Sequence, residues 1–71
     1  MTFTDKLLRV TRESSSHSGN PNYLLTFSVG RYRTALDSTL GFEITPSMEG
    51  KTFTVLLEHM RVVDLEEVPA P

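Results

Sequence analysis

The chain has 71 residues, of which 38% are hydrophobic and 23% charged, with a net charge of −2 and no cysteine. This length allows one domain, and the apolar content excludes a fully disordered chain. The absence of cysteine excludes disulfides and thiolate metal sites, and the negative net charge argues against a general nucleic-acid binder. No apolar run approaches the roughly 18 residues of a membrane helix, so we expect a cytoplasmic protein without membrane contact.

The charges are divided unevenly along the chain. Residues 1–35 hold five Lys or Arg against two Asp or Glu, a balance of +3, whereas residues 36–71 hold two against seven, a balance of −5. One interpretation is an ordinary solvated surface. The other is a basic and an acidic side, which would suit one charged partner or assembly into a homo-oligomer.

The first predicted element is a strand over residues 3–13. Leu8 and Val10 alternate there with Arg9 and Thr11, which is the two-residue period of a half-buried strand. The pattern predicts Leu8 and Val10 on the core side.

A polar loop follows over residues 14–21 and ends in turn-forming residues. It is longer than the about 2–5 residues usual in a hairpin, and long loops on small scaffolds often carry binding residues. A flexible connector is an equal alternative. The loop residues that we predict to contact a protein partner are Ser15, Ser16, His17 and Asn20.

The next two elements form a predicted hairpin. Apolar residues on every second position from Tyr23 to Val29 indicate a strand over residues 22–29, and residues 32–36 return after a tight turn at Gly30 and Arg31. Near residues 37–41 we expect one short helical or 3-10 turn, capped by Asp37 or Ser38 and ended by Gly41.

Two further strands complete the chain, over residues 52–60 and 61–68, with a hairpin or sharp bend around residues 59–61. The sequence therefore predicts an all-β fold, a small five-stranded barrel in residues 1–68, with a frayed tail in residues 69–71. SH3-like topology is favoured over OB-like topology. The predicted core comprises Leu8, Val10, Leu25, Phe27, Val29, Leu40, Phe42, Ile44, Phe53, Val55, Leu57, Val63 and Leu65.

No residue pattern indicates an active site. His17 and His59 lack the spacing of metal ligands, no Gly-x-Ser-x-Gly motif accompanies the serines, and Asp64 and Glu66 share a strand face without an evident cleft. We therefore predict no catalytic residue, no metal, no cofactor and no enzymatic activity.

One cluster, Arg31-Tyr32-Arg33, combines cations with an aromatic ring, as single-stranded nucleic-acid sites on small barrels do. Strand alternation places the two arginines opposite Tyr32, which weakens this interpretation, and the same cluster could contact a protein. The residues of the nucleic-acid alternative are Lys6, Arg9, Arg12, Arg31, Tyr32 and Arg33.

The order of Asn20-Pro21-Asn22-Tyr23, an aromatic strand, the run from Arg33 to Ser38, the run from Gly41 to Ile44 and a threonine-rich strand resembles small uncharacterised proteins of actinobacteria and their phages. The resemblance covers residues 20–57 and carries no assigned activity. It implies an accessory protein that acts by contact, in the host cytosol if a phage encodes it.

We accordingly expect a non-enzymatic protein-interaction module, a phage-type accessory or regulatory protein with a partner from host or phage. The first alternative is a single-stranded nucleic-acid-binding barrel. The second is a self-assembling structural or decoration protein.

Overall fold

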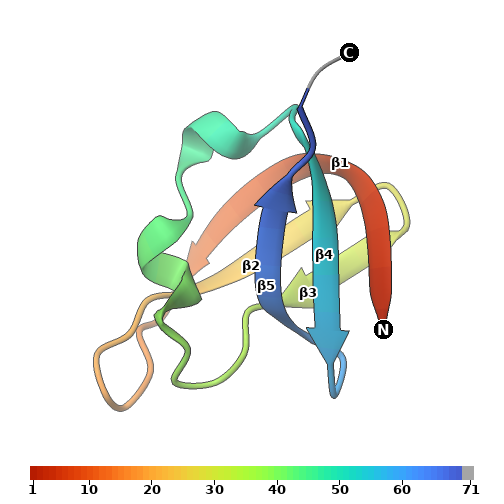
Figure 1. Ribbon diagram of the computed structural model, residues 1–71. Coiled ribbons are helices and arrows are strands. Elements are labelled where there is room, and N and C mark those ends of the chain that lie inside the picture. The colour runs from red at the N-terminus through yellow and green to blue at the C-terminus, as the bar shows by residue number, and fades with distance from the viewer. Residues whose placement is uncertain (70–71) are drawn as a thin grey trace.

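The computed structural model describes residues 1–69, and within them the chain forms five strands and two 3-10 helices (Figure 1). Their bounds in chain order are β1 (Thr2–Glu13), β2 (Asn22–Phe27), β3 (Gly30–Arg33), η1 (Thr39–Glu43), η2 (Pro46–Met48), β4 (Thr52–Glu58) and β5 (Arg61–Glu67). The predicted all-β class is confirmed, and each of the five predicted strands overlaps an observed one. The predicted turn at Gly30 and Arg31 was wrong, because β3 begins at Gly30 and the turn lies at Ser28 and Val29. Of the frayed tail predicted for residues 69–71, residues 70–71 lie outside the described part.

The strands form one sheet in the order β3-β2-β1-β4-β5, with antiparallel pairing between neighbours. Strand β1 serves both halves of this sheet, because its first part pairs with β4 and its second part with β2. Figure 1 shows β1 as a long curved strand, with β4 and β5 in front of β2 and β3. The two halves thus face each other across the core.

The two edges of the sheet meet at one place. Thr34 and Val62 form a single parallel bridge, where the backbone N–H of Ala35 donates to the carbonyl oxygen of Val62 at 2.9 Å. Thr34 is buried, and its hydroxyl accepts a hydrogen bond from the N–H of Tyr23. The edges touch here without a continuous ladder, so the sheet is not closed.

A bulge in β1 changes which residues reach the core. The register with β2 shifts between Leu7 and Arg9, so one extra residue enters β1 and the side chains that follow change face. Leu7 is fully buried, whereas Leu8 is 49% exposed. The prediction of Leu8 in the core was therefore wrong, because it extended one alternation across the bulge.

A second register shift lies in the β4–β5 pair, where Leu56 faces Asp64 but Leu57 faces Val62. Val63 is the extra residue and is half-buried, while Val62 is fully buried. The predicted core position at Val63 is thus taken by Val62.

Two further core predictions were wrong, because Val29 and Phe42 are 64% and 66% exposed. Strand β2 ends at Phe27, so Val29 lies in the turn before Gly30.

Asp5 holds this turn: its carboxylate accepts hydrogen bonds from the Ser28 hydroxyl at 2.7 and 2.6 Å and from the Val29 N–H at 3.1 Å. The Ser28 hydrogen bond is the main cause that lowers the pKa of Asp5.

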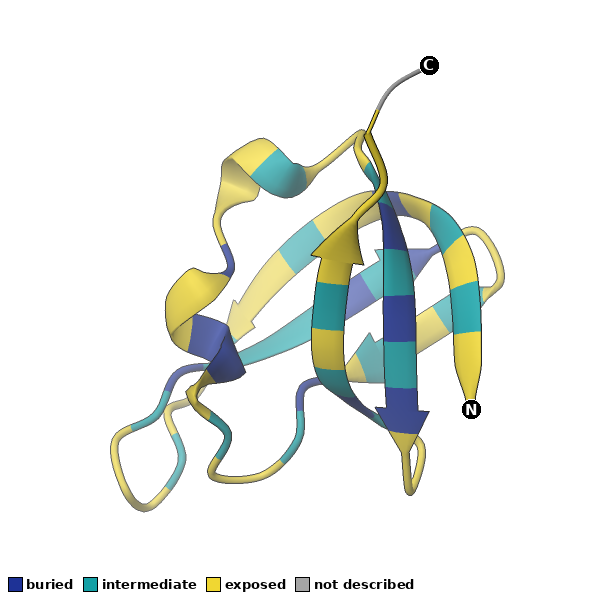
Figure 2. Cartoon of the chain, in the orientation of Figure 1, coloured by how far each residue is buried: buried dark blue, intermediate teal, exposed yellow. Residues whose placement is uncertain are grey.

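The remaining residues of the predicted core are all buried or partly buried in the structure. Figure 2 shows the chain coloured by burial. Val10 and Leu65 are partly buried against the core. The predicted residues that are buried are Leu25, Phe27, Leu40, Ile44, Phe53, Val55 and Leu57.

The expected helical turn is η1. Of the two predicted caps, Asp37 and Ser38, the structure has Ser38, whose hydroxyl accepts from the Leu40 N–H at 3.0 Å. Gly41 does not end this helix. It is buried within it, and an added Cβ would overlap the carbonyl oxygen of Pro21. This close approach holds the end of the 14–21 loop against η1.

The bulge in β1 predicts losses of stability of very different size when two neighbouring leucines are replaced by alanine. Leu7→Ala should cost about 2–4 kcal/mol of unfolding free energy, because it leaves a cavity in the core. Leu8→Ala should cost less than about 1 kcal/mol, because Leu8 lies at the surface. Urea unfolding of both variants checks this, and a larger loss for Leu8→Ala would contradict the observed phase of β1.

The contact between Gly41 and Pro21 predicts a steric requirement for glycine. Gly41→Ala should destabilise by about 3 kcal/mol, since backbone must move to admit the methyl group. Gly19→Ala is the control: Gly19 has open space around it and a φ of 87°, so only the left-handed conformation is strained, at about 1 kcal/mol. Equal thermal shifts would contradict the packing argument.

Candidate functional site

The two-residue turn between β4 and β5 is the most unusual segment of backbone. Glu58 and Arg61 are paired, and the residues between them, His59 and Met60, have φ values of 52° and 65°. Positive φ at both positions is the pattern of a type I′ turn, which favours Asn and Gly. Neither is present here, and Met60 is 71% exposed. The turn therefore holds two larger side chains at the surface at a cost in backbone strain.

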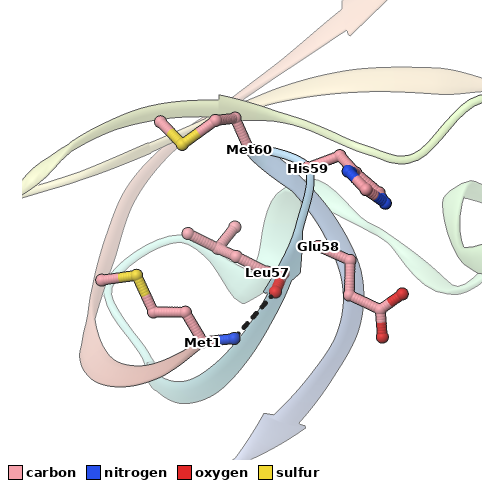
Figure 3. Close-up of a pocket in the computed structure, with 5 residues that line it drawn as sticks. All are labelled: Met1, Leu57, Glu58, His59 and Met60. Atoms are coloured by element: carbon pink, nitrogen blue, oxygen red, sulfur yellow. Dashed lines mark hydrogen bonds between the residues drawn. The ribbon is translucent and has the colours of Figure 1, made fainter.

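An apolar depression of about 490 Å³ lies on one side of this turn (Figure 3). We call it the methionine pocket; its lining residues are Met1, Leu57, Glu58, His59 and Met60. The Met1 amino group donates to the Leu57 carbonyl at 3.1 Å, and the Leu57 N–H donates to the Met1 carbonyl at 2.7 Å. In Figure 3 the side chains of Met1, Leu57 and Met60 lie to one side, and those of Glu58 and His59 to the other.

A polar and cationic surface lies on the β3 side of the turn. Two depressions of about 290 and 300 Å³ share Arg33 and Arg61, and we call them together the arginine groove. Arg31, Tyr32, His59 and Met60 also line the first depression. The other lining residues of the second are Glu13, Ser14, Asn22 and Leu36.

The three arginines of the groove are held differently. Arg61 donates from Nη1 to the Thr34 carbonyl at 3.1 Å, which ties it to the meeting point of the sheet edges. Arg33 donates from Nε and Nη2 to the two Glu13 carboxylate oxygens at 2.9 and 3.3 Å. Arg31 makes no ion pair with any residue of the described range 1–69. The charged residues that line the groove are thus three arginines and one carboxylate, that of Glu13. Their formal charge is positive, although the net charge of the chain is negative.

Three of the four predicted loop residues use their side chains in hydrogen bonds within the domain, and only one of these bonds lies inside the loop. The Ser16 hydroxyl accepts from the Asn20 N–H at 3.1 Å, Asn20 Nδ2 donates to the Asp37 carbonyl, and Ser15 Oγ accepts from Arg12. His17 is exposed. None of these predicted residues lines the groove, so the structure does not bring them together with Arg31, Tyr32 and Arg33, which do line it.

The six residues of the nucleic-acid alternative do not share one surface. Arg9 and Arg31 flank Thr26 in one row across β1, β2 and β3, and Arg33 lies two rows along on the same face. Lys6 lies on the part of β1 that pairs with β4. Arg12 stacks 5.5 Å from the centre of the Tyr23 ring. They therefore do not form one continuous track.

Sequence reasoning missed Met1, Glu13, Leu36, His59, Met60 and Arg61 as site residues. The bend predicted at residues 59–61 was the available signal, because a tight hairpin turn without Asn or Gly indicates a strained backbone. The contact between β3 and β5 that brings Arg61 to Arg33 depends on long-range pairing, which local patterns do not encode.

Comparison of the chain with protein-family models, with curated proteins and with solved structures found no significant match. Over residues 1–69, no three His, Asp or Glu side chains are grouped closely enough to hold a metal ion. In the same part of the chain, no helix has the length and apolar character needed to cross a membrane.

The strained turn predicts a gain in stability on substitution. The double change His59→Asn with Met60→Gly should stabilise the domain by about 1 kcal/mol, because these residues adopt positive φ at little cost. In a domain of this size that corresponds to a rise in Tm of about 4–8 °C, measured by thermal unfolding. A lower Tm would show that the side chains of the turn contribute more than its backbone costs.

Proposed function

We propose that this protein is a non-enzymatic protein-interaction module, and that it binds an acidic segment of another protein around the β4–β5 turn. The observation that carries the proposal is the position of this turn between the methionine pocket and the arginine groove. One short segment could place an apolar side chain in the first and carboxylates in the second. The resemblance to small proteins of actinobacteria and their phages supports an accessory role for such binding.

The chemistry of the two surfaces supports a protein partner. Methionine side chains are flexible and polarisable, and they line surfaces that adapt to different apolar groups. Arginine presents a planar fork of N–H donors that matches a carboxylate. Met60 and His59 border both surfaces, so the turn lies at the centre of the proposed contact.

The aromatic residues give little support to the nucleic-acid alternative. Single-stranded nucleic acids stack their bases on exposed aromatic rings. Tyr32 instead packs against Phe3, with ring centres 5.7 Å apart, and Tyr23 lies beneath Arg12. Within the described residues, Phe42 is the only aromatic side chain that is mostly exposed, and it lines neither the methionine pocket nor the arginine groove.

We further propose that the sheet is a half-open barrel of the OB-like kind, the topology that the sequence placed second to SH3-like. Support comes from the sharing of β1 between β2 and β4 and from the parallel contact of Thr34 with Val62. OB-like barrels bind ligands on the face of their second and third strands and at the loops after the first and fourth. The arginine groove adjoins β3 and the turn after β4, which agrees with that placement.

The test is binding of a short fluorescein-labelled oligoglutamate peptide that ends in leucine, followed by fluorescence anisotropy. Arg31→Gln should weaken binding about three- to tenfold, because among the described residues Arg31 has no ion pair to lose. Met60→Ser should weaken it about as much through the apolar contact. Lys6→Gln is the matched control, since it removes the same charge from outside the groove, and it should have little effect.

Labelled oligothymidine provides the competing arm of this experiment. Tighter binding of oligothymidine, with a steep loss of affinity as salt rises and an equal effect of Lys6→Gln, would overturn the protein-binding proposal in favour of nucleic acid. Absence of binding to either probe would overturn both.

A further inference from the structure

Glu13 stands out because, of the described residues that line the arginine groove, it is the only carboxylate. Its two oxygens meet Arg33 side-on at 2.9 and 3.3 Å, with Nε and Nη2 as the donors. This two-bond arrangement is how arginine binds the carboxylate of a partner. Glu13 therefore occupies the position that an acidic ligand of Arg33 would take.

The ion pair is placed to open at little cost. The Arg33 and Glu13 side chains are 56% and 29% exposed, and an ion pair this accessible contributes between 0 and about 1 kcal/mol. The backbone at Glu13 is held independently, because Glu13 pairs with Asn22 across β1 and β2 and its carbonyl accepts from Arg12 at 2.7 Å. Only the Glu13 side chain has to move for Arg33 to become free.

We propose that Glu13 is a built-in competitor that occupies the carboxylate site of the arginine groove, and that a carboxylate of the bound partner takes its place on Arg33. This inference rests on the proposed function and specifies which arginine anchors the acidic segment. Arg31 and Arg61 attract the segment by charge, and Arg33 exchanges one carboxylate for another.

Such a competitor favours some ligands over others. A weakly held anion gains little from Arg33, because it must displace a carboxylate that is already well placed. A partner carboxylate held nearby by the methionine pocket has a high effective concentration and can displace it. Glu13 thereby raises the discrimination between a matched acidic segment and unrelated polyanions.

The test is the affinity of the same labelled oligoglutamate–leucine peptide for Glu13→Gln. This variant should bind about two- to fivefold more tightly than the unmodified protein. The gain is the strength of the exposed Glu13–Arg33 ion pair, which the peptide no longer has to displace, expressed as a ratio of affinities. Glu43→Gln is the matched control, because it removes an equal charge from an exposed position in η1 and lies outside the groove. It should change the affinity much less.

A second measurement separates competition from a general change of charge. With Arg33→Gln already present, Glu13→Gln should alter the affinity no more than Glu43→Gln does, since there is no longer a site to compete for. Normal binding by the unmodified protein with no gain in Glu13→Gln, or a loss, would overturn the competitor role and leave the proposed function standing. Failure of every variant to bind the peptide would overturn both.

Discussion

The structure depends on one strand being shared by two halves of a sheet. Strand β1 pairs with β4 through residues 2–6 and with β2 through residues 7–13, and the bulge at Leu8 lies at the start of the second run of pairing. A bulge increases the local bend and twist of a strand. Without it, Phe3 and Val10 would lie on opposite faces; with it, both pack against one core. The bulge is therefore what allows a chain of 71 residues to bury two small sheet halves against each other.

The same sharing explains how the charges are arranged. The basic first half of the chain supplies β1, β2 and β3, and the acidic second half supplies β4 and β5, so the two charge balances fall on different strands. The meeting of Thr34 with Val62 is the exception, because it carries Arg61 from the acidic half to the arginines of β3. The arginine groove thus forms where the two halves touch.

Local patterns predicted the strands well, because alternation of apolar and polar residues records which face of a strand is buried. They failed where the alternation changes phase, at Leu8 and Val63, since an extra residue in a bulge leaves no mark in composition. Arg31 and Arg33 could be selected from the sequence as a cationic pair. The sequence predicted a bend at residues 59–61, but it did not show that His59, Met60 and Arg61 lie beside these arginines. The contact of β3 with β5 joins residues far apart in the sequence, as Thr34 and Val62 show. Glu13 contributed to the sequence-based predictions only through the charge balance of residues 1–35, because its contact with Arg33 also depends on how distant segments come together.

The groups around the β4–β5 turn share a property that the core lacks: each can rearrange at small cost. The Arg33–Glu13 pair is partly exposed, and the side chains of Met1 and Met60 are flexible and exposed. The core residues Leu7, Leu25 and Val55 are fully buried and take no part in these surfaces. Changes at the proposed binding surface can therefore proceed without loss of core packing. A domain too small to spare stability benefits from this separation, because affinity can be altered at the turn and the groove while the buried residues stay unchanged.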